Sequence, residues 1–219
     1  MIKVSNLNKS FGSGENRIRI FDNACIDIKK GEMVALMGRS GSGKSTFLNI
    51  ISGMLIPDSG TILLDGIPFN YMSNAERMRI RRETLGYVVQ NFGLINRKTA
   101  WENVRMMVRS RKYRENDYER LHCLFDELGI SEKKNMYLDH LSNGEKQRIA
   151  IARALIDDKR IILADEPTGA LDRENAESVM KSFCHLVKEH GCTILIATHD
   201  MEVANCCDRR LNVENCRII

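Results

Sequence analysis

Residues 33–46 read MVALMGRSGSGKST and decide the fold. The first five residues form a short apolar run, which predicts a buried strand. The following eight, residues 38–45, match the pattern Gly, any four residues, Gly, Lys, Ser or Thr, which is typical of a phosphate-binding loop between a strand and a helix. Glycines let the loop turn its backbone N–H groups toward phosphate oxygens, and the next helix directs the positive end of its dipole there.

This loop predicts a site for a nucleoside triphosphate. We expect Lys44 to span the β- and γ-phosphates, the Ser45 hydroxyl to ligate Mg²⁺, and Thr46 to add a bond to the α-phosphate. The expected nucleotide-binding residues of the loop are Gly38, Arg39, Ser40, Gly41, Ser42, Gly43, Lys44, Ser45 and Thr46.

A second chemical signal follows the apolar run Ile161–Ala164, where Asp165 and Glu166 stand side by side. Successive residues of a strand point to opposite faces. Asp165 is therefore expected to face the Mg²⁺ of the phosphate loop, and Glu166, at the strand end, to polarise an attacking water. Alone, the pair also fits an acidic turn after a core strand; together with a phosphate loop it indicates hydrolysis.

Length, composition and charge pattern indicate what kind of protein this is. The chain has 219 residues, a formal net charge of +4, 43% hydrophobic and 28% charged residues. These values predict one folded domain, and the interleaved charges do not indicate a nucleic-acid partner. The longest uncharged stretch, Ser45–Pro57, is shorter than the roughly 20 apolar residues of a membrane-spanning helix. The polar N-terminus does not resemble a signal peptide, so we expect a cytoplasmic protein.

The fold class is predicted as α/β, with residues 1–219 as a single domain. Short β-branched runs predict strands at Ile2–Val4, Ile18–Ile28, Met33–Met37, Thr61–Leu64, Tyr87–Val89, Ile161–Ala164, Thr193–Ala197 and Leu211–Val213. Helical periodicity predicts helices at Lys44–Ser52, Ala75–Glu83, Trp101–Arg109, Asp117–Leu128, Gly144–Ile156 and Ala176–His190. Strand signals stop between about residues 91 and 157, which indicates a helical subdomain inserted into the core.

The third motif is LSNGEKQR, residues 141–148, at the start of a predicted helix. A serine followed by glycine at a helix start offers hydroxyl and backbone donors to an anion. Alone it also fits an ordinary helix cap, and its place some twenty residues before Asp165 favours the functional interpretation.

Six motifs in this order resemble the ATP-binding subunits of ABC transporters over essentially the whole chain. They are the phosphate loop, Gln90 in YVVQNF, the signature LSNGE, the acidic pair Asp165-Glu166, the turn GALD that ends at Asp172, and His199 in ATHD. The segment LADEPTGALD, residues 163–172, is most similar to the group that serves macrolide, antimicrobial-peptide and lipoprotein exporters. FGLI at 92–95 and ENV at 102–104 are similar to bacteriocin-export ATPases.

The resemblance implies a P-loop core with a parallel sheet, an antiparallel β part near the N-terminus and an inserted helical subdomain. It also implies a head-to-tail homodimer, in which ATP lies between the phosphate loop of one copy and the signature of the other. The implied catalytic residues are Glu166 as base, His199 on the γ-phosphate, Gln90 and Lys44. The implied metal ligands are Ser45, Gln90 and Asp165. The implied signature residues are Ser142, Asn143, Gly144 and Glu145, and Asp172 is expected to reach across the dimer.

Two departures from the family pattern concern the site. Asn143-Gly144-Glu145 stands where Gly-Gly-Gln is usual. A carboxylate at Glu145 is expected to slow turnover or to weaken dimer closure, through repulsion from the triphosphate. The adenine-stacking ring is usually Tyr, and here Phe11 holds the corresponding position. Phe21 is the competing ring, with a place in the core as its alternative.

The leading functional hypothesis is an ATPase subunit that powers a separate integral-membrane permease, exporting a peptide, lipoprotein or drug-like substrate. The rival is a regulatory or mechanical module of the cell-division type, which uses the same cassette without transport. Either would place the chain on the inner face of the membrane. The arginines 77, 79, 81 and 82 form either a solvated helix face or a contact with the partner or lipid headgroups.

The cysteines and the histidines other than His199 are not expected to take part in the nucleotide site. The seven cysteines are interpreted as reduced thiols that mostly fill the core. A redox or metal role for the Cys206-Cys207 pair is the alternative. The histidines other than His199 are expected to face solvent.

Overall fold

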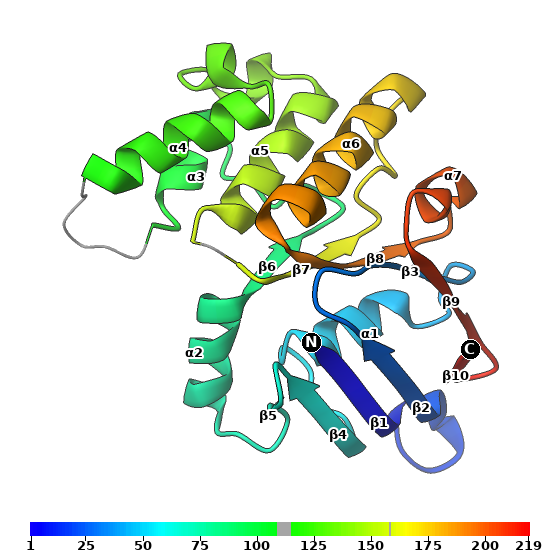
Figure 1. The fold of residues 1–219 in the computed structure, drawn as a ribbon. Helices are drawn as coiled ribbons and strands as arrows, with labels where there is room; N and C mark the ends of the chain where they lie inside the picture. The colour runs from blue at the N-terminus through cyan, green and yellow to red at the C-terminus, as the bar shows by residue number, and fades with distance from the viewer. Residues whose placement is uncertain (109–114, 158) are drawn as a thin grey trace.

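The central sheet holds the strands that carry the predicted chemistry. The computed structural model describes residues 1–108, 115–157 and 159–219, and there the sheet has the strand order β10-β9-β3-β8-β7-β6 (Figure 1). Its members are β3 (Met33–Met37), β6 (Leu85–Val88), β7 (Ile161–Asp165), β8 (Thr193–Thr198), β9 (Arg209–Glu214) and β10 (Arg217–Ile218). All neighbours are parallel except β10, which is antiparallel to β9. The predicted α/β class is confirmed.

A second, antiparallel sheet is built mainly from the N-terminal part of the chain. Its strands are β1 (Ile2–Phe11), β2 (Ile18–Ile28), β4 (Ser59–Leu64) and β5 (Ile67–Pro68), in the order β2-β1-β4-β5. The predicted antiparallel part is therefore present. The bounds predicted for β2 and β3 match the structure residue for residue, whereas β1 is longer than expected.

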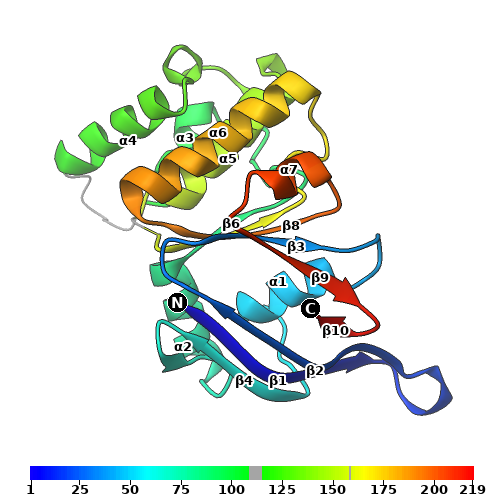
Figure 2. The same cartoon turned by 45° about the vertical axis from the view of Figure 1, so that its right-hand side comes forward.

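Helices cover both faces of the central sheet. They are α1 (Lys44–Ile51), α2 (Asn74–Thr84), α3 (Ala100–Arg105), α4 (Glu115–Glu127), α5 (Asn143–Leu155), α6 (Arg173–His190) and α7 (Met201–Asn205). Short 3₁₀ turns occupy Gly14–Asn16, Ser131–Lys133 and Leu138–His140. Helices α4, α5 and α6 lie on one side of the central sheet, and α1 lies on the other, facing the antiparallel sheet (Figure 2). Arg109, the predicted end of the helix here called α3, lies outside the described residues.

Alternation along the central strands produces two separate cores. On β8, Ile194 and Ile196 pack into the core under α3 to α6, whereas Leu195 and Ala197 pack toward α1 and the antiparallel sheet. All four side chains are fully buried. A parallel strand covered on both faces can therefore be apolar at consecutive positions, as Ile194–Ala197 of β8 are.

The arginine cluster does not form one solvated helix face, and its contact with the partner or lipid headgroups stays a prediction. Arg77 is buried and its guanidinium donates to the Met72 carbonyl, and Arg81 reaches the Ser52 carbonyl at 3.4 Å. Only Arg79 and Arg82 of this group are exposed. Two of the four charges are therefore used internally, where α2 meets its preceding loop and the end of α1.

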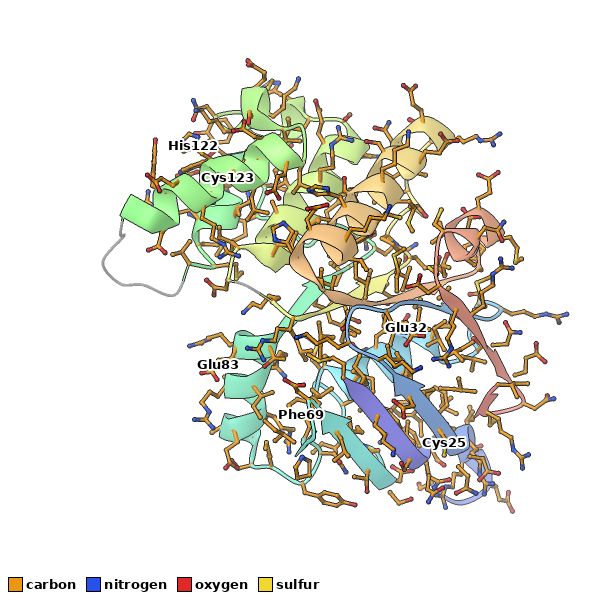
Figure 3. The ribbon with its side chains drawn as sticks, in the orientation of Figure 1. Cys25, Glu32, Phe69, Glu83, His122 and Cys123 are labelled. Atoms are coloured by element: carbon orange, nitrogen blue, oxygen red, sulfur yellow. The ribbon has the colours of Figure 1, made fainter. Side chains whose placement is uncertain are left out.

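Two further expectations were wrong. Among the described residues only Cys192 is a buried cysteine, because Cys25, Cys123 and Cys206 are exposed and the remaining three are intermediate. Burial raises the pKa of the Cys207 thiol to about 12, and neighbouring Cys206 adds to this, so the pair does not present reactive thiolates. His122, labelled in Figure 3, is partly buried against Trp101 and Tyr118 rather than facing solvent.

No helix among the described residues is both long enough and apolar enough to cross a bilayer.

Packing between Phe21 and Phe47 joins β2 to α1, with ring centroids 5.5 Å apart. Both side chains are fully buried. We predict that Phe47→Ala lowers the free energy of unfolding by about 3–5 kcal/mol, since it removes a ring from a closed core. Ile18→Ala, at an exposed position of β2, is the matched control and should change it by less than about 0.5 kcal/mol. Urea denaturation measures both; equal effects would contradict this account of the core.

Candidate nucleotide-binding and hydrolysis site

The phosphate loop connects the end of β3 to the start of α1, as predicted. Gly43, directly before the helix, has φ of 104°, and a Cβ atom there would lie 2.6 Å from Ile20 Cγ2. A side chain is therefore excluded by both backbone conformation and space. The loop brings backbone N–H groups and the N-terminus of α1 to one point at the carboxyl end of the sheet.

Lys44 is the first residue of α1, and its ammonium group is turned back into the loop. The side chain is buried, and Nζ donates to the carbonyl oxygens of Gly38 at 2.8 Å and Arg39 at 3.3 Å. Nζ also lies 3.5 Å from Glu166 Oε1. A buried positive charge is thus held inside the loop, where it can meet phosphate oxygens.

Asp165 ends β7 beside the loop. The Ser45 hydroxyl donates to its carboxylate, while Asp165 Oδ1 is buried without a hydrogen-bond partner in the described chain. Burial raises the pKa of Asp165, and neighbouring Glu166 raises it further, against the lowering effects of Ser45 and Lys44. A hydroxyl and an under-coordinated carboxylate oxygen side by side are suitable ligands for Mg²⁺.

Glu166 occupies a strained position at the end of β7. Its φ is 45°, an unfavourable region for a residue with a side chain, and such strain gathers at functional sites. Its carboxylate accepts from Thr198 Oγ1 at 3.2 Å, and Oε1 lies 2.9 Å from His199 Nδ1. The structure therefore brings Lys44, Glu166 and His199 together from three separate parts of the chain, whereas the sequence linked His199 to the other two only through the family pattern.

Tyr87 belongs to this neighbourhood and was not predicted. Burial and the nearby Asp165 charge raise its pKa well above the ordinary value, and its hydroxyl donates to Asn49 Oδ1 at 3.3 Å. A cavity of about 650 Å³ also opens beside the loop, lined by Arg39, Ser42 and His199 and by the β9–β10 turn. No motif in the sequence marks Tyr87 or the β9–β10 turn, because their place beside the loop depends on the order of strands in the sheet.

Gln90 follows β6 and its side chain is exposed. A Cβ atom at Gly169 would lie 3.5 Å from Gln90 Nε2, so this amide borders the turn after Glu166. Arg153 of α5 holds the loop that follows, donating to the carbonyl oxygens of Phe92 at 2.9 Å and of Gly93. Burial lowers the pKa of Arg153. This guanidinium ties the segment after Gln90 to the helix that carries the signature.

The signature residues cap the N-terminus of α5. Glu145 N donates to Ser142 Oγ at 3.2 Å and Ser142 N donates to Glu145 Oε2 at 2.8 Å, which is a capping box. Lys133 Nζ lies 3.1 Å from Glu145 Oε1. The Glu145 carboxylate is therefore already compensated within the chain.

Asn143 and Gly144 contact the segment that leads into α6. Asn143 Nδ2 donates to the Ala170 carbonyl at 3.3 Å, and a Cβ atom at Gly144 would lie 2.0 Å from Asn175 Oδ1. Asn175 is in turn bonded to Asp172 through its backbone N–H at 2.9 Å and its amide at 2.8 Å. The signature and Asp172 thus form one connected surface.

That surface is separate from the phosphate loop. Ser142 and Asn143 are exposed, and in the described part of the chain no hydrogen bond or ion pair joins residues 142–145 to residues 38–46. One chain therefore presents both halves of the expected site without bringing them into contact.

The two candidate stacking rings are placed differently. Phe21 is fully buried, so it belongs to the core. Phe11 is 43% exposed at the end of β1, with Lys9 Nζ 5.3 Å from its ring centroid. Only the Phe11 ring is accessible to a base.

A phosphate loop after a parallel strand, a buried lysine in it, and an aspartate and glutamate at the end of a nearby strand define a P-loop nucleoside triphosphatase. Residues 21–169 match the family model described as ABC transporter. The chain belongs to the ABC transporter family, as an ATP-binding subunit, and it is an ATPase.

Individual relatives agree with this assignment. The chain is 39% identical over 220 residues to the uncharacterized ABC transporter ATP-binding protein YknY of Bacillus subtilis, covering 100% of this chain and 95% of YknY. It is 36% identical to the lipoprotein-releasing system ATP-binding protein LolD of Bordetella avium, and the match covers 100% of this chain and 95% of LolD. The dimeric structure of MJ0796, from Methanocaldococcus jannaschii, matches with a TM-score of 0.90 and 38% identity, covering 100% and 96%.

We predict that Lys133→Met raises the pKa of Glu145. Burial of this carboxyl raises its pKa, but the Ser142 N–H and Lys133 outweigh this effect and leave it lowered. Its stabilising contribution is therefore present above the ordinary pKa of glutamate and is lost as the pH falls through the folded value. Carboxyl NMR titration should show the rise, with a loss of stability near pH 7 of about 0.5–1 kcal/mol. Lys134→Met is the neighbouring control, and an unchanged Glu145 titration in Lys133→Met would contradict the pairing.

Proposed function

We propose that this ATPase works as a head-to-tail homodimer that powers a separate integral-membrane permease. The observation that carries the proposal is the separation of the signature, Ser142 to Glu145, whose first two residues are exposed, from the phosphate loop of the same chain. A second copy can supply the missing half to each site. MJ0796, at 38% identity, has been solved as a dimer, which supports this arrangement.

We assign the nucleotide contacts to the loop and the signature. Residues Gly38 to Thr46 hold the triphosphate, Phe11 stacks on the base, and Ser142 to Gly144 of the other copy close over the phosphates. Ser45, Gln90 and Asp165 hold Mg²⁺, which supplies neutralisation of phosphate charge when bound. The buried, unpartnered Asp165 Oδ1 supports this assignment.

Hydrolysis then follows from the groups around Glu166. Its carboxylate takes a proton from the attacking water, and Thr198 and His199 hold it in position. Lys44 stabilises the charge that develops on the transferred phosphoryl group. His199 is well exposed and can turn from Glu166 toward the γ-phosphate. Gln90, beside Gly169, positions the water, and Asp172 contacts the other copy.

Glu145, the unusual residue of the signature, is compatible with ATP hydrolysis at the facing site. Glu145 was expected to repel the triphosphate, but Lys133 pairs with it at 3.1 Å. The pair contributes little net charge to the facing site. We therefore infer that Glu145 permits normal closure as long as Lys133 is present.

The transported substrate is proposed from similarity alone. The relative LolD is described as part of a lipoprotein-releasing system, which supports export of a lipoprotein, peptide or drug-like molecule. Bacteriocin export is the narrower form suggested by the segment 92–95. We place the chain on the inner face of the membrane, attached through the permease, with residues 91–157 as its helical subdomain.

Glu166→Gln tests the mechanism directly. We expect the variant to bind ATP and to accumulate as a dimer, while turnover falls by about 10²–10⁴ because the general base is lost. Gel filtration with and without ATP measures the dimer, and phosphate release measures turnover.

Glu15→Gln is the matched control, since Glu15 is an exposed carboxylate in a 3₁₀ turn. It should leave both readouts unchanged. Turnover by Glu166→Gln at the unaltered rate would show that Glu166 is not the base.

The permease is tested separately by purifying the tagged chain from detergent-solubilised membranes. A multi-span membrane protein in stable stoichiometry with it, whose removal abolishes substrate movement in vesicles, is expected. Recovery with such a partner that moves no substrate would favour the regulatory module instead.

A further inference from the structure

Two histidines and a glutamate gather outside the nucleotide site. Glu127 is the last residue of α4, and His185 and His190 lie on the final turns of α6. Each offers one ligand atom, and these atoms all lie within 4.8 Å of one another. His190 Nε2 is 3.2 Å from Glu127 Oε2, and the two imidazole centroids are 6.3 Å apart. Segments 63 residues apart in sequence therefore meet at this point.

The donor set selects a class of ion. Imidazole nitrogen with one carboxylate suits Zn²⁺, Co²⁺, Ni²⁺ or Cu²⁺, whereas Mg²⁺ and Ca²⁺ prefer oxygen ligands alone. All three side chains are exposed, so little desolvation opposes binding, and water can complete the coordination.

The end of α6 provides a second reason for a cation to bind here. His190 is the last residue of a helix of 18 residues, which ends at Gly191 with φ of 60°. The free carbonyl groups at a helix C-terminus carry partial negative charge and favour a cation.

Basic side chains near the cluster limit its affinity for a metal ion. A cavity of about 530 Å³ beside Glu127 and His190 is lined by the basic side chains of Lys30, Arg120, Lys159 and Arg160. These positive charges repel a divalent ion, so binding depends on direct bonds from the two imidazoles and the carboxylate. Cys123, one turn before Glu127 on α4 and labelled in Figure 3, lines the same cavity but is not among the grouped ligand atoms.

We propose that Glu127, His185 and His190 bind a transition-metal ion of the Zn²⁺ class, which joins the end of α4 to the end of α6. In chain order, α4 comes between β6 and β7. Helix α6 begins directly after Asp172 and leads into β8. The ion would replace a single Glu127–His190 contact by three bonds. It would thereby restrain α4 relative to the helix that begins at the expected dimer contact.

Metal binding by the untagged full-length chain tests this proposal. Calorimetric titration with Zn²⁺ should give one site per chain, and the apparent unfolding temperature should rise with Zn²⁺. Replacing both histidines, in His185→Ala/His190→Ala, should weaken binding by more than about tenfold, the loss seen even when an outer partner of a metal ligand is removed. Glu127→Gln should weaken it as well.

His140→Ala is the matched control, because His140 is an exposed histidine away from this cluster. It should bind Zn²⁺ as the unaltered chain does. Equal binding by the double variant, no binding by the unaltered chain, or a thiolate-to-cobalt charge-transfer band on Co²⁺ addition would overturn the proposal. Unfolding temperatures without metal verify that the variants are folded, and none of these readouts depends on ATP hydrolysis.

Discussion

Burial of the Lys44 ammonium group at the carboxyl end of the central sheet is the constraint on which the rest of the structure depends. A buried cation is tolerated only where oxygen atoms surround it. Two of these come from the loop itself and one from Glu166, on a strand more than a hundred residues later. Strands β3 and β7 must therefore lie in one sheet, with β8 between them, and His199 at the end of β8 joins the same group.

The second half of the site is held in place independently of Lys44. Ser142 to Glu145 are held by contacts that do not involve the phosphate loop: the capping box, Lys133 and Ala170. Arg153, on the helix that follows the signature, fixes the loop after Gln90. A displacement of α5 would therefore move the signature and the Gln90 loop together, which is the coupling that a composite site between two copies needs.

The features that could be predicted from the sequence are those formed by one continuous segment of the chain. The strand Met33–Met37, the loop that follows and the acidic end of β7 are continuous segments, and their chemistry can be inferred from residue order. Sequence reasoning missed β5, β10 and α7, which are too short to show a period. It also misjudged Arg77, because its partner, the Met72 carbonyl, is fixed by loop geometry. The pairing of Glu145 with Lys133 could not be inferred either, because it depends on tertiary packing. The place of Tyr87 beside Asp165 likewise depends on β6 and β7 being neighbours.

The central claim is that two chains share each site, and mixing two inactive variants tests it most directly. Lys44→Ala removes the phosphate loop charge, and Ser142→Arg blocks the signature. In a mixed dimer, one of the two sites combines an intact Lys44 with an intact Ser142. The account predicts that each variant alone lacks ATPase activity and that the mixture regains part of it, with a maximum near equal proportions. No recovery at any ratio, or full activity of Ser142→Arg alone, would contradict it.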